Sequence, residues 1–436
     1  SGQLNLPFQY FIGNGSSQTF DKNFRELGIN SLFASADIDF NNYLYLTLSG
    51  RNDWFSTLDS RNNNLFYPSA GLSFLLSDAW NSKPSWMNYA KIRTSWAQVG
   101  GGAPNPYGLA QTFSAQAVPH LGQSLMNVTS ATIPALLTPY TSTTYEAGLE
   151  MRVFNNRLGM DLTIYDRTTT DDIVNAAIPP SSAYSSVALN VGKMKNRGIE
   201  LMFSGTVIKS ERGLNWDMSY NMAYNDNNVI KIADGLTSLQ LPGATTRTLN
   251  GWIYHFEGQP FGVIAGFKQL KNASGQLVFN RNSGTPISGP LEVLGRGVPP
   301  LAMGINNNFR YKNLNMSFLV DSRWGGSIYA ATNAYGTGFG VHKRTVANGV
   351  RETGVQVNGV DQAGAPYSAS VPAQNYFQGI AYTITDNFVE SADFIKLRSL
   401  SIGYNLPTAL LVKTPFQSAN ISLVGRNLLL LYNASE

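Results

Sequence analysis

The sequence has no cysteine, few charged residues and no long apolar run. The absence of cysteine excludes disulfides, thiolate metal sites and cysteine nucleophiles. Only 13% of the 436 residues are charged, whereas soluble domains carry roughly 25%. The richest apolar run near the end is Leu428 to Tyr432, far shorter than the roughly 18–20 apolar residues of a membrane-spanning helix. These absences leave a large all-β protein, and strands that face lipid through alternate residues would explain the low charge.

The residues for an enzyme active site or a metal centre are also missing. The three histidines, His120, His255 and His342, lie far apart and have no carboxylates at metal-ligand spacing. The carboxylate pair 171–172 has no partner to orient a base, and the Gly run 100–102 is followed by prolines instead of a phosphate-binding helix. The net charge of +4 is spread over single Lys and Arg residues. We therefore predict no catalytic residues, no metal, no cofactor and no nucleic-acid partner.

Apolar and polar residues alternate along many segments. From Asn30 to Phe40 every second residue is apolar and most of those between are polar, and Tyr43 to Arg51 repeats the pattern. A period of two predicts strands with one apolar and one polar face. The Asn41-Asn42 pair between them predicts a tight hairpin, because Asn tolerates the left-handed backbone of such turns. Between Ile395 and Leu400 the alternation slips, which predicts a β-bulge.

About twelve such strands can be counted, and short connections alternate with long ones. All long loops therefore lie at one end of the sheet, as in outer-membrane barrels with tight periplasmic turns and long extracellular loops. A soluble β-sandwich or propeller is the alternative, but the apolar face carries too few charges for it. The predicted extracellular segments are residues 1–28, 52–64, 99–141, 169–196, 225–300 and 325–391, and residues 29–436 form a partial barrel.

Aromatic residues near the predicted strand ends fit the same architecture, because membrane barrels carry aromatic girdles at both interfaces. These residues are Tyr45, Phe66, Tyr67, Tyr89, Trp96, Tyr165, Trp216 and Tyr404.

An open sheet of this size would leave two unpaired edges in lipid, where each unsatisfied backbone group costs several kcal/mol. We therefore expect the chain to be part of a larger barrel, preceded by roughly half a barrel and followed by one closing strand.

Several runs, in order, resemble the barrel of SusC-type (SusC/RagA) TonB-dependent transporters. They include FASADIDFNNYLYLTLSGRNDWFSTL, LFYPSAGLSFLLSDAW, YAKIRTSWAQVG and, near the end, ADFIKLRSLSIGYNLP with ISLVGRNLLLL. In that family an R-x-D strand end, a YPS-x-G strand and a K-x-R-x-SW-x-x-G strand follow one another. The resemblance covers nearly the whole chain. It implies a transmembrane antiparallel barrel of about 22 strands, of which this chain would hold about the tenth to the twenty-first. The plug domain and TonB box of such transporters do not occur in these residues.

The resemblance further implies import of a bulky nutrient, an oligosaccharide or a peptide, across the outer membrane of a Bacteroidota-type bacterium. A SusD-like surface lipoprotein would cover the extracellular loops, and TonB would act through a plug region outside this chain. The alternative is an outer-membrane barrel that serves as a structural or docking component of an envelope complex without transport.

Two groups of candidate site residues follow. Charged residues on the polar strand faces are predicted to face the lumen, more as a solvated and mutually paired lining than as a ligand site. They are Asp37, Arg51, Glu146, Glu150, Arg152, Asp161, Glu200, Asp217, Asp321 and Arg323. Aromatic residues in the two longest loops are candidates for recognition of sugar faces or peptide side chains, with ordinary loop packing as the alternative. They are Trp252, Tyr254, Trp324, Tyr329, Tyr335 and Tyr367.

Overall fold

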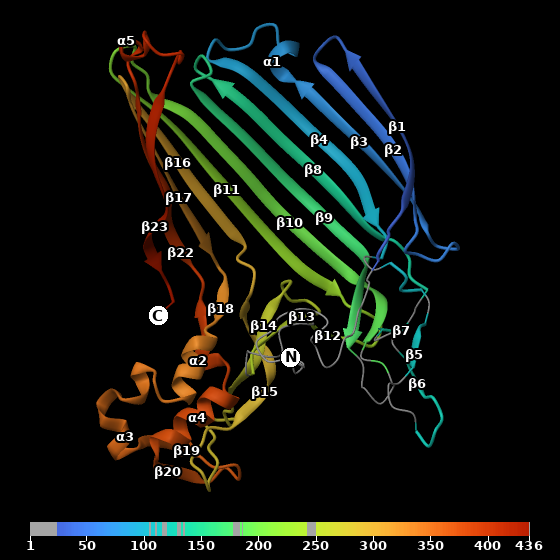
Figure 1. The fold of residues 1–436 in the computed structure, drawn as a ribbon, viewed down its shortest axis with the longest axis vertical. Coiled ribbons are helices and arrows are strands. Elements are labelled where there is room, and N and C mark those ends of the chain that lie inside the picture. Colours follow the sequence, from blue (N-terminus) through green and yellow to red (C-terminus); the bar gives the residue numbers. More distant parts are fainter. Residues whose placement is uncertain are drawn as a thin grey trace, which may run out of the picture.

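The computed structural model is dominated by one broad, tilted sheet of long antiparallel strands (Figure 1). The structure describes residues 24–435 apart from 104–105, 110, 116–119, 129–131, 134–135, 178–183, 185 and 242–249. The 13-stranded sheet has β7 (Thr132–Ile133) as a short parallel addition beside β10. The other strands follow one another in chain order: β1 (Ile29–Phe40), β2 (Leu44–Phe55), β3 (Asn64–Leu75), β4 (Met87–Gly101), β8 (Tyr140–Val153), β9 (Leu158–Ala177), β10 (Ser186–Ile208), β11 (Leu214–Lys231), β16 (Leu301–Tyr311), β17 (Leu314–Trp324), β22 (Phe394–Asn405) and β23 (Asn420–Asn433).

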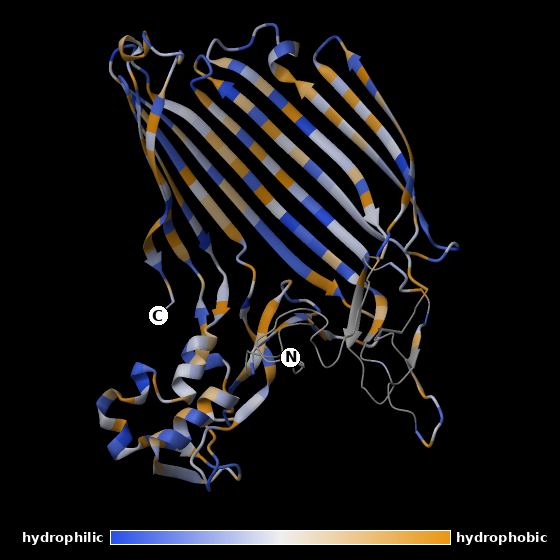
Figure 2. Ribbon diagram, viewed as in Figure 1, coloured by the Kyte–Doolittle hydropathy of each residue, from blue (hydrophilic) through white to orange (hydrophobic). Residues whose placement is uncertain are grey.

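The sheet confirms the predicted all-β antiparallel barrel architecture. Hydrophobic and hydrophilic residues alternate along the long strands (Figure 2), and the antiparallel register aligns apolar residues from strand to strand. One such row joins Met160 on β9 to Phe203 on β10, Tyr220 on β11 and Ile305 on β16. We call the face that carries this row the apolar face, and the opposite one the polar face. In the described part of the chain β1 and β23 are the two edges of the sheet.

The apolar face has the height of a bilayer core. On β11 its residues run without a charge from Leu214 to Tyr224, a length of about 34 Å at roughly 3.4 Å per residue. A strand tilt of 35–45° reduces this to about 25 Å, which is the typical height of the apolar band in outer-membrane barrels. Among the described residues, no helix has the length and apolar composition of a membrane-spanning helix.

Short turns lie at one end of the sheet and long segments at the other (Figure 1). The predicted hairpin after β1 is confirmed, since Asn41 and Asn42 have positive φ angles of 52° and 57°. The other short connections include α1 (Leu76–Ala79), between β3 and β4, and α5 (Thr408–Leu411), between β22 and β23.

The predicted loop at 169–196 needs correction. Strand β9 continues to Ala177 and β10 begins at Ser186, so most of this segment is a paired ribbon. Asp171 and Gly192 have φ angles of 60° and 69° and interrupt the regular pairing. The strands extend past the apolar band, where polar and apolar residues no longer alternate regularly and Val187 and Ile173 pack against hydrophobic clusters of the loops. The predicted segment 1–28 lies outside the described residues up to position 23.

The other predicted loops are also shorter than expected or contain structure of their own. The segment predicted at 52–64 narrows to residues 56–63, between β2 and β3. Strands β4 and β8 border the segment predicted at 99–141, which contains β5 (Phe113–Ala115) and β6 (Met126–Val128).

The first of the two longest predicted loops, 225–300, begins too early, because β11 continues to Lys231. Beyond it, most of this loop and the loop 325–391 fold into a compact extension that we call the loop subdomain (Figure 1). Its first part is the sheet β12 (Ser238–Gln240), β13 (Trp252–Phe256), β14 (Val263–Gln269) and β15 (Ser288–Arg296). Its second part contains β18 (Ser327–Tyr329), α2 (Ala331–Gly338), η3 (Lys343–Thr345), η4 (Ala347–Gly349), α3 (Val350–Thr353), β19 (Val355–Val360), β20 (Pro366–Val371), α4 (Ala373–Thr383), η5 (Asp386–Phe388) and β21 (Val389–Ser391).

Buried contacts join these two parts. The Thr385 hydroxyl accepts a hydrogen bond from the Phe267 N–H at 3.0 Å and donates one to the Asn250 carbonyl at 2.6 Å. Thr385 is 2% exposed, and a Cβ at Gly266 would clash with its side chain at 2.4 Å. Buried Phe279 from the first part packs with Val357 and Val371 of the second. The two loops therefore form a single folded unit.

Candidate functional site

The register places all ten predicted lumen residues on the polar face. Thr47 on β2 pairs with Asp37 and with Gly71, and the same row continues through Ser95 to Glu146. A second row joins Thr163 on β9 to Glu200 on β10. Arg51, Glu150, Arg152 and Asp161 lie an even number of residues away on the same strands. Asp217 lies six residues from Ala223, which pairs with Glu200, and Asp321 and Arg323 join the same face through Gly304 and Ala302. That this face lines the lumen stays a prediction.

Arg93 on β4 forms the most complete ion pair of this face. Its Nη2 donates to Asp161 Oδ1 at 2.6 Å and to Thr163 Oγ1 at 2.6 Å, and its Nη1 donates to Asp161 Oδ2 at 3.2 Å. Both charged side chains are 32% exposed, so solvent weakens the pair, but its two-pronged geometry fixes both groups. The sequence analysis missed Arg93, although Lys91, Arg93 and Ser95 alternate with the mostly apolar residues Ala90, Ile92, Thr94 and Trp96, which assigns Arg93 to this face.

The predicted bulge at Ile395–Leu400 is confirmed, and it gives Arg398 a role that alternation could not predict. The register between β22 and both of its neighbours jumps from Leu397 to Ser399, so Arg398 is the extra residue. Its Nε donates to Asp321 Oδ2 at 3.1 Å and its Nη1 to Asn427 Oδ1 at 2.9 Å. The bulge therefore aims Arg398 at a carboxylate of the polar face.

Several other charges of the polar face are also paired, as the sequence analysis expected. Glu150 accepts from Arg152 at 3.0 Å, and Asp53, a neighbour of Arg51 on the same strand, accepts from it at 2.7 Å. Asp217 accepts from the Thr206 hydroxyl at 2.7 Å. Most of this lining is thus neutralised within the sheet.

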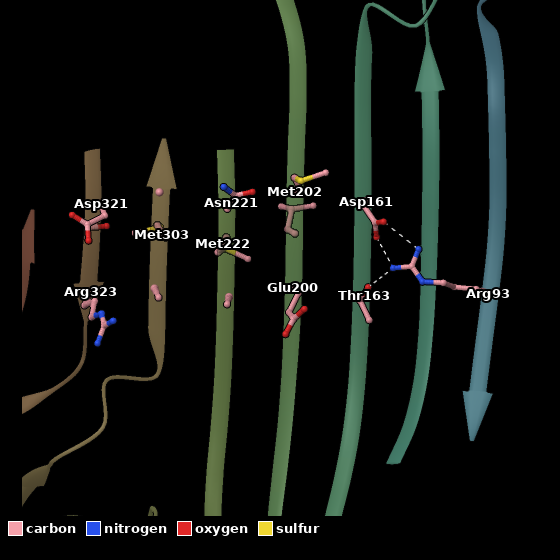
Figure 3. Close-up of a pocket in the computed structure, with 15 residues that line it drawn as sticks. Arg93, Asp161, Thr163, Glu200, Met202, Asn221, Met222, Met303, Asp321 and Arg323 are labelled. Carbon is pink, nitrogen blue, oxygen red and sulfur yellow. Dashed lines mark hydrogen bonds and ion pairs between the residues drawn. The ribbon is translucent and has the colours of Figure 1, made fainter. Parts of the chain in front are cut away.

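A cavity of about 620 Å³ lies against the centre of the polar face (Figure 3). It is lined from β4 to β17 and includes the Arg93–Asp161 pair at one end and Asp321 with Arg323 at the other. Glu200 and Asn221 lie between them (Figure 3). This cavity is the site at which the polar face could contact a ligand.

The six aromatic candidates do not form one site. Trp324 ends β17 on the apolar face and stacks on Tyr432 at 5.6 Å between ring centroids. It therefore belongs to the apolar face of the sheet and not to a recognition loop, because β17 runs to Trp324 and the predicted loop begins only at residue 325.

The remaining five candidates pack within the loop subdomain. Burial raises the pKa of Tyr329 to about 12, and this residue lies against a cluster that includes Phe388. Each of the others has an aromatic neighbour. The ring pairs are Trp252 with Phe267 at 5.9 Å, Tyr254 with Phe256 at 5.4 Å, Tyr335 with Phe339 at 6.1 Å and Tyr367 with Phe279 at 6.2 Å.

Of the eight aromatic residues predicted to form interfacial girdles, four lie on the apolar face and four on the polar face. Phe66, Trp96, Trp216 and Tyr404 lie on the apolar face, where they pair in register with Asn52, Ala70, Phe309 and Leu314. Tyr45, Tyr67, Tyr89 and Tyr165 lie on the polar face opposite Asp39, Arg51, Arg152 and Glu146. A tyrosine can serve either face because its ring is apolar and its hydroxyl forms hydrogen bonds.

An antiparallel sheet with a bilayer-high apolar face, a charged opposite face and a large subdomain beyond its long-loop end defines an outer-membrane β-barrel of the transporter type. The chain belongs to the TonB-dependent receptor-like β-barrel family, whose model matches residues 2–428. It is an outer-membrane protein.

Individual relatives agree with this assignment. The chain is 26% identical over 433 residues to TonB-dependent receptor P3 of Formosa agariphila, with 93% of this chain and 41% of the relative covered. It is 24% identical to TonB-dependent receptor SusC of Bacteroides thetaiotaomicron, over 61% of this chain and 26% of the relative. The RagAB peptide importer in its closed-closed state has a similar fold, with a TM-score of 0.78, 19% identity and coverage of 98% of this chain and 47% of that one. The chain thus spans less than half the length of each of these relatives.

Proposed function

We propose that the full-length protein imports a bulky nutrient, an oligosaccharide or a peptide, across the outer membrane in a TonB-dependent step. Membership of the TonB-dependent receptor-like barrel family is the observation that carries this proposal. The cavity in the polar face supports it, because a wall of charged and amide side chains suits a polar solute. The relatives are named as receptors and importers, which favours transport over catalysis, and no enzymatic step is part of the proposal.

The proposal includes two partners. A SusD-like surface lipoprotein would cover the loop subdomain, since that subdomain extends beyond the long-loop end of the barrel (Figure 1). TonB would act from the periplasm through a plug region outside this chain. SusC and the RagAB importer are the relatives that suggest this arrangement.

Gene deletion tests the function. A strain that lacks the protein should fail to grow on one class of nutrient, peptides or oligosaccharides, and the wild-type gene should restore growth. Inactivation of TonB should produce the same defect. If the protein is only a structural component of an envelope complex, growth on every nutrient should be unchanged while the recovery of other envelope proteins falls.

Affinity purification from solubilised outer membranes tests the partner. A lipoprotein at one copy per barrel is the expected result, and recovery of the barrel alone under several mild detergents would contradict the lid proposal.

A further inference from the structure

On the apolar face, the lipid-facing residues of β10 are followed directly by positive charge. Strands β9, β10 and β11 lie side by side in the middle of the sheet (Figure 1). Their apolar rows end where Ile199 on β10 pairs in register with Ile164 on β9 and Tyr224 on β11. All three side chains are more than 40% exposed, as expected for residues that contact lipid. The next residue of β10 on this face is Arg197.

Two more cations follow Arg197 on the same face. Lys195 and Lys193 occupy the next alternate positions, and at roughly 3.4 Å per residue the three cations span about 14 Å. They lie toward the end of β10 that begins at Ser186, which is the long-loop end of the sheet. In outer-membrane barrels the long loops are extracellular, so this end meets the outer leaflet. We call Lys193, Lys195 and Arg197 the basic ladder.

The basic ladder distinguishes this part of the sheet from the rest. In strands β1 to β4, β8, β16 and β17, every charged residue lies on the polar face and none on the apolar face. On β4, the uncharged residues Trp96 and Gln98 occupy the same rows as Arg197 and Lys195. The end of the apolar band therefore does not by itself require three cations.

The sheet neutralises the ladder only in part. Asp166 Oδ2 accepts a hydrogen bond from Arg197 Nε at 2.9 Å and lies 3.1 Å from Lys195 Nζ, so one carboxylate serves two cations. Lys193 is exposed and forms no ion pair within the part of the chain that the structure describes. The Arg197 side chain is 65% exposed, and its Nη atoms donate no hydrogen bond to any described residue.

The other carboxylates next to the ladder are paired with other cations. Asp226 lies opposite Arg197 on β11, but its ion pair is with Arg296 at 3.2 Å. Lys231 lies opposite Lys193 and pairs with Asp234 at 2.5 Å. Three cations and the single carboxylate of Asp166 therefore leave the ladder with a net charge of +2.

Threonine hydroxyls border the ladder on the side of β9. Thr168 and Thr170 pair in register with Lys195 and Lys193, and Thr143 on β8 pairs with Thr168. A hydroxyl can donate a hydrogen bond to a phosphate oxygen and can exchange hydrogen bonds with the hydroxyls of a sugar. Cations beside hydroxyls at the edge of a lipid-facing surface suit a phosphorylated sugar that carries acyl chains.

We infer that the basic ladder is a binding site for lipopolysaccharide of the outer leaflet, with a phosphate group of its lipid A held by Lys193, Lys195 and Arg197. The acyl chains of the same lipid lie along the apolar face from Ile199 towards the short-turn end. Hydrogen bonds between such cations and phosphate are short and strong. The inference rests on the outer-membrane location of the chain and holds whether or not the protein imports a nutrient.

Binding of lipid A to the delipidated full-length protein tests the site, with native mass spectrometry measuring the bound fraction at each lipid concentration. Removal of the phosphate groups from lipid A should weaken binding at least tenfold. A cation at a membrane surface contributes about fivefold to the binding of an anionic lipid. The triple variant Lys193→Gln, Lys195→Gln and Arg197→Gln should therefore bind lipid A roughly 100-fold more weakly, with an unchanged affinity for the dephosphorylated lipid.

Asp166→Asn tests the site in the opposite direction. Loss of this carboxylate releases Lys195 and Arg197 from their shared partner, so the variant should bind lipid A roughly fivefold more tightly than the wild-type protein. A ladder that only stabilises the fold predicts no such gain, and unchanged or weaker binding by this variant would contradict the inference.

Three exposed cations in the short turns provide the matched control, because they lie at the opposite end of the sheet. The triple variant Lys209→Gln, Arg212→Gln and Lys413→Gln loses the same net charge and should bind lipid A as tightly as the wild-type protein. Equal weakening by both triple variants would show that only net charge matters and would overturn the inference. Binding of phosphatidylglycerol as tight as that of lipid A, or no effect of dephosphorylation, would overturn it as well.

Discussion

Replacing Met218 with arginine should strongly destabilise the protein in its membrane. Met218 lies on the apolar face of β11 and lines an apolar groove together with Met160 and Phe203. The apolar residues of β11 run from Leu214 to Tyr224, which puts Met218 within about 3 Å of the middle of a band about 25 Å high. An arginine at that depth costs roughly 2–4 kcal/mol in membrane barrels. The equilibrium constant for folding should therefore fall by roughly 30- to 700-fold.

Urea unfolding of the full-length protein in lipid vesicles measures this change. Ser219→Arg is the matched control, because Ser219 is the next residue on β11 and pairs in register with Ser204 and Asn306 on the polar face. It should change the free energy of unfolding by less than about 1 kcal/mol. If both variants lose the same stability, the assignment of the apolar face to lipid is wrong.

Three further predictions concern the polar face and the loop subdomain. Arg398→Ala should cost roughly 1–3 kcal/mol, since it removes the guanidinium that is paired with Asp321. The double variant with Asp321→Ala should recover most of the lost thermal stability. If the double variant is as unstable as Arg398→Ala, loss of the Arg398–Asp321 ion pair is not the cause of the destabilisation. Thr385→Val should destabilise the loop subdomain by roughly 1–3 kcal/mol, because it removes the two hydrogen bonds of the Thr385 hydroxyl. Limited proteolysis should cut the loops of the variant faster, while the heat-modifiability of the barrel stays unchanged. Equal proteolysis rates in the variant and the wild-type protein would show that these hydrogen bonds do not join the two loops. The Arg281 guanidinium lowers the pKa of Asp361 below its usual value, so this pair should stabilise the subdomain above about pH 4 and be lost as the pH falls through the lowered pKa. Proteolysis of the loop subdomain should therefore become faster at low pH, and Asp361→Asn should remove this pH dependence. If the variant keeps the pH profile of the wild-type protein, the Arg281–Asp361 pair is not the origin of the pH dependence.

Alternation alone predicted much of the barrel. It assigned Glu200 and Arg323 to the polar face and located the bulge around Arg398, because a strict period of two links sequence position to sheet face. It could not tell which face Tyr45 or Tyr165 would take, since tyrosine suits both.

The loop subdomain could not be predicted in the same way. Thr385 bonds to Phe267, 118 residues earlier in the chain, and no local pattern records such a pairing. The cavity against the polar face was equally hidden, because it depends on Ala223 and Ala302 lying side by side through the register of β11 with β16. The ribbon formed by β9 and β10 was missed because Asp171 and Gly192 interrupt its pairing and the alternation of polar and apolar residues is irregular there.

Uptake of a labelled nutrient by intact cells tests the central claim most directly. Cells that carry the full-length protein should accumulate a labelled peptide or oligosaccharide in the periplasm, and cells that lack either the protein or TonB should not. Equal accumulation in all three strains, for every peptide and oligosaccharide tried, would contradict a role in TonB-dependent import.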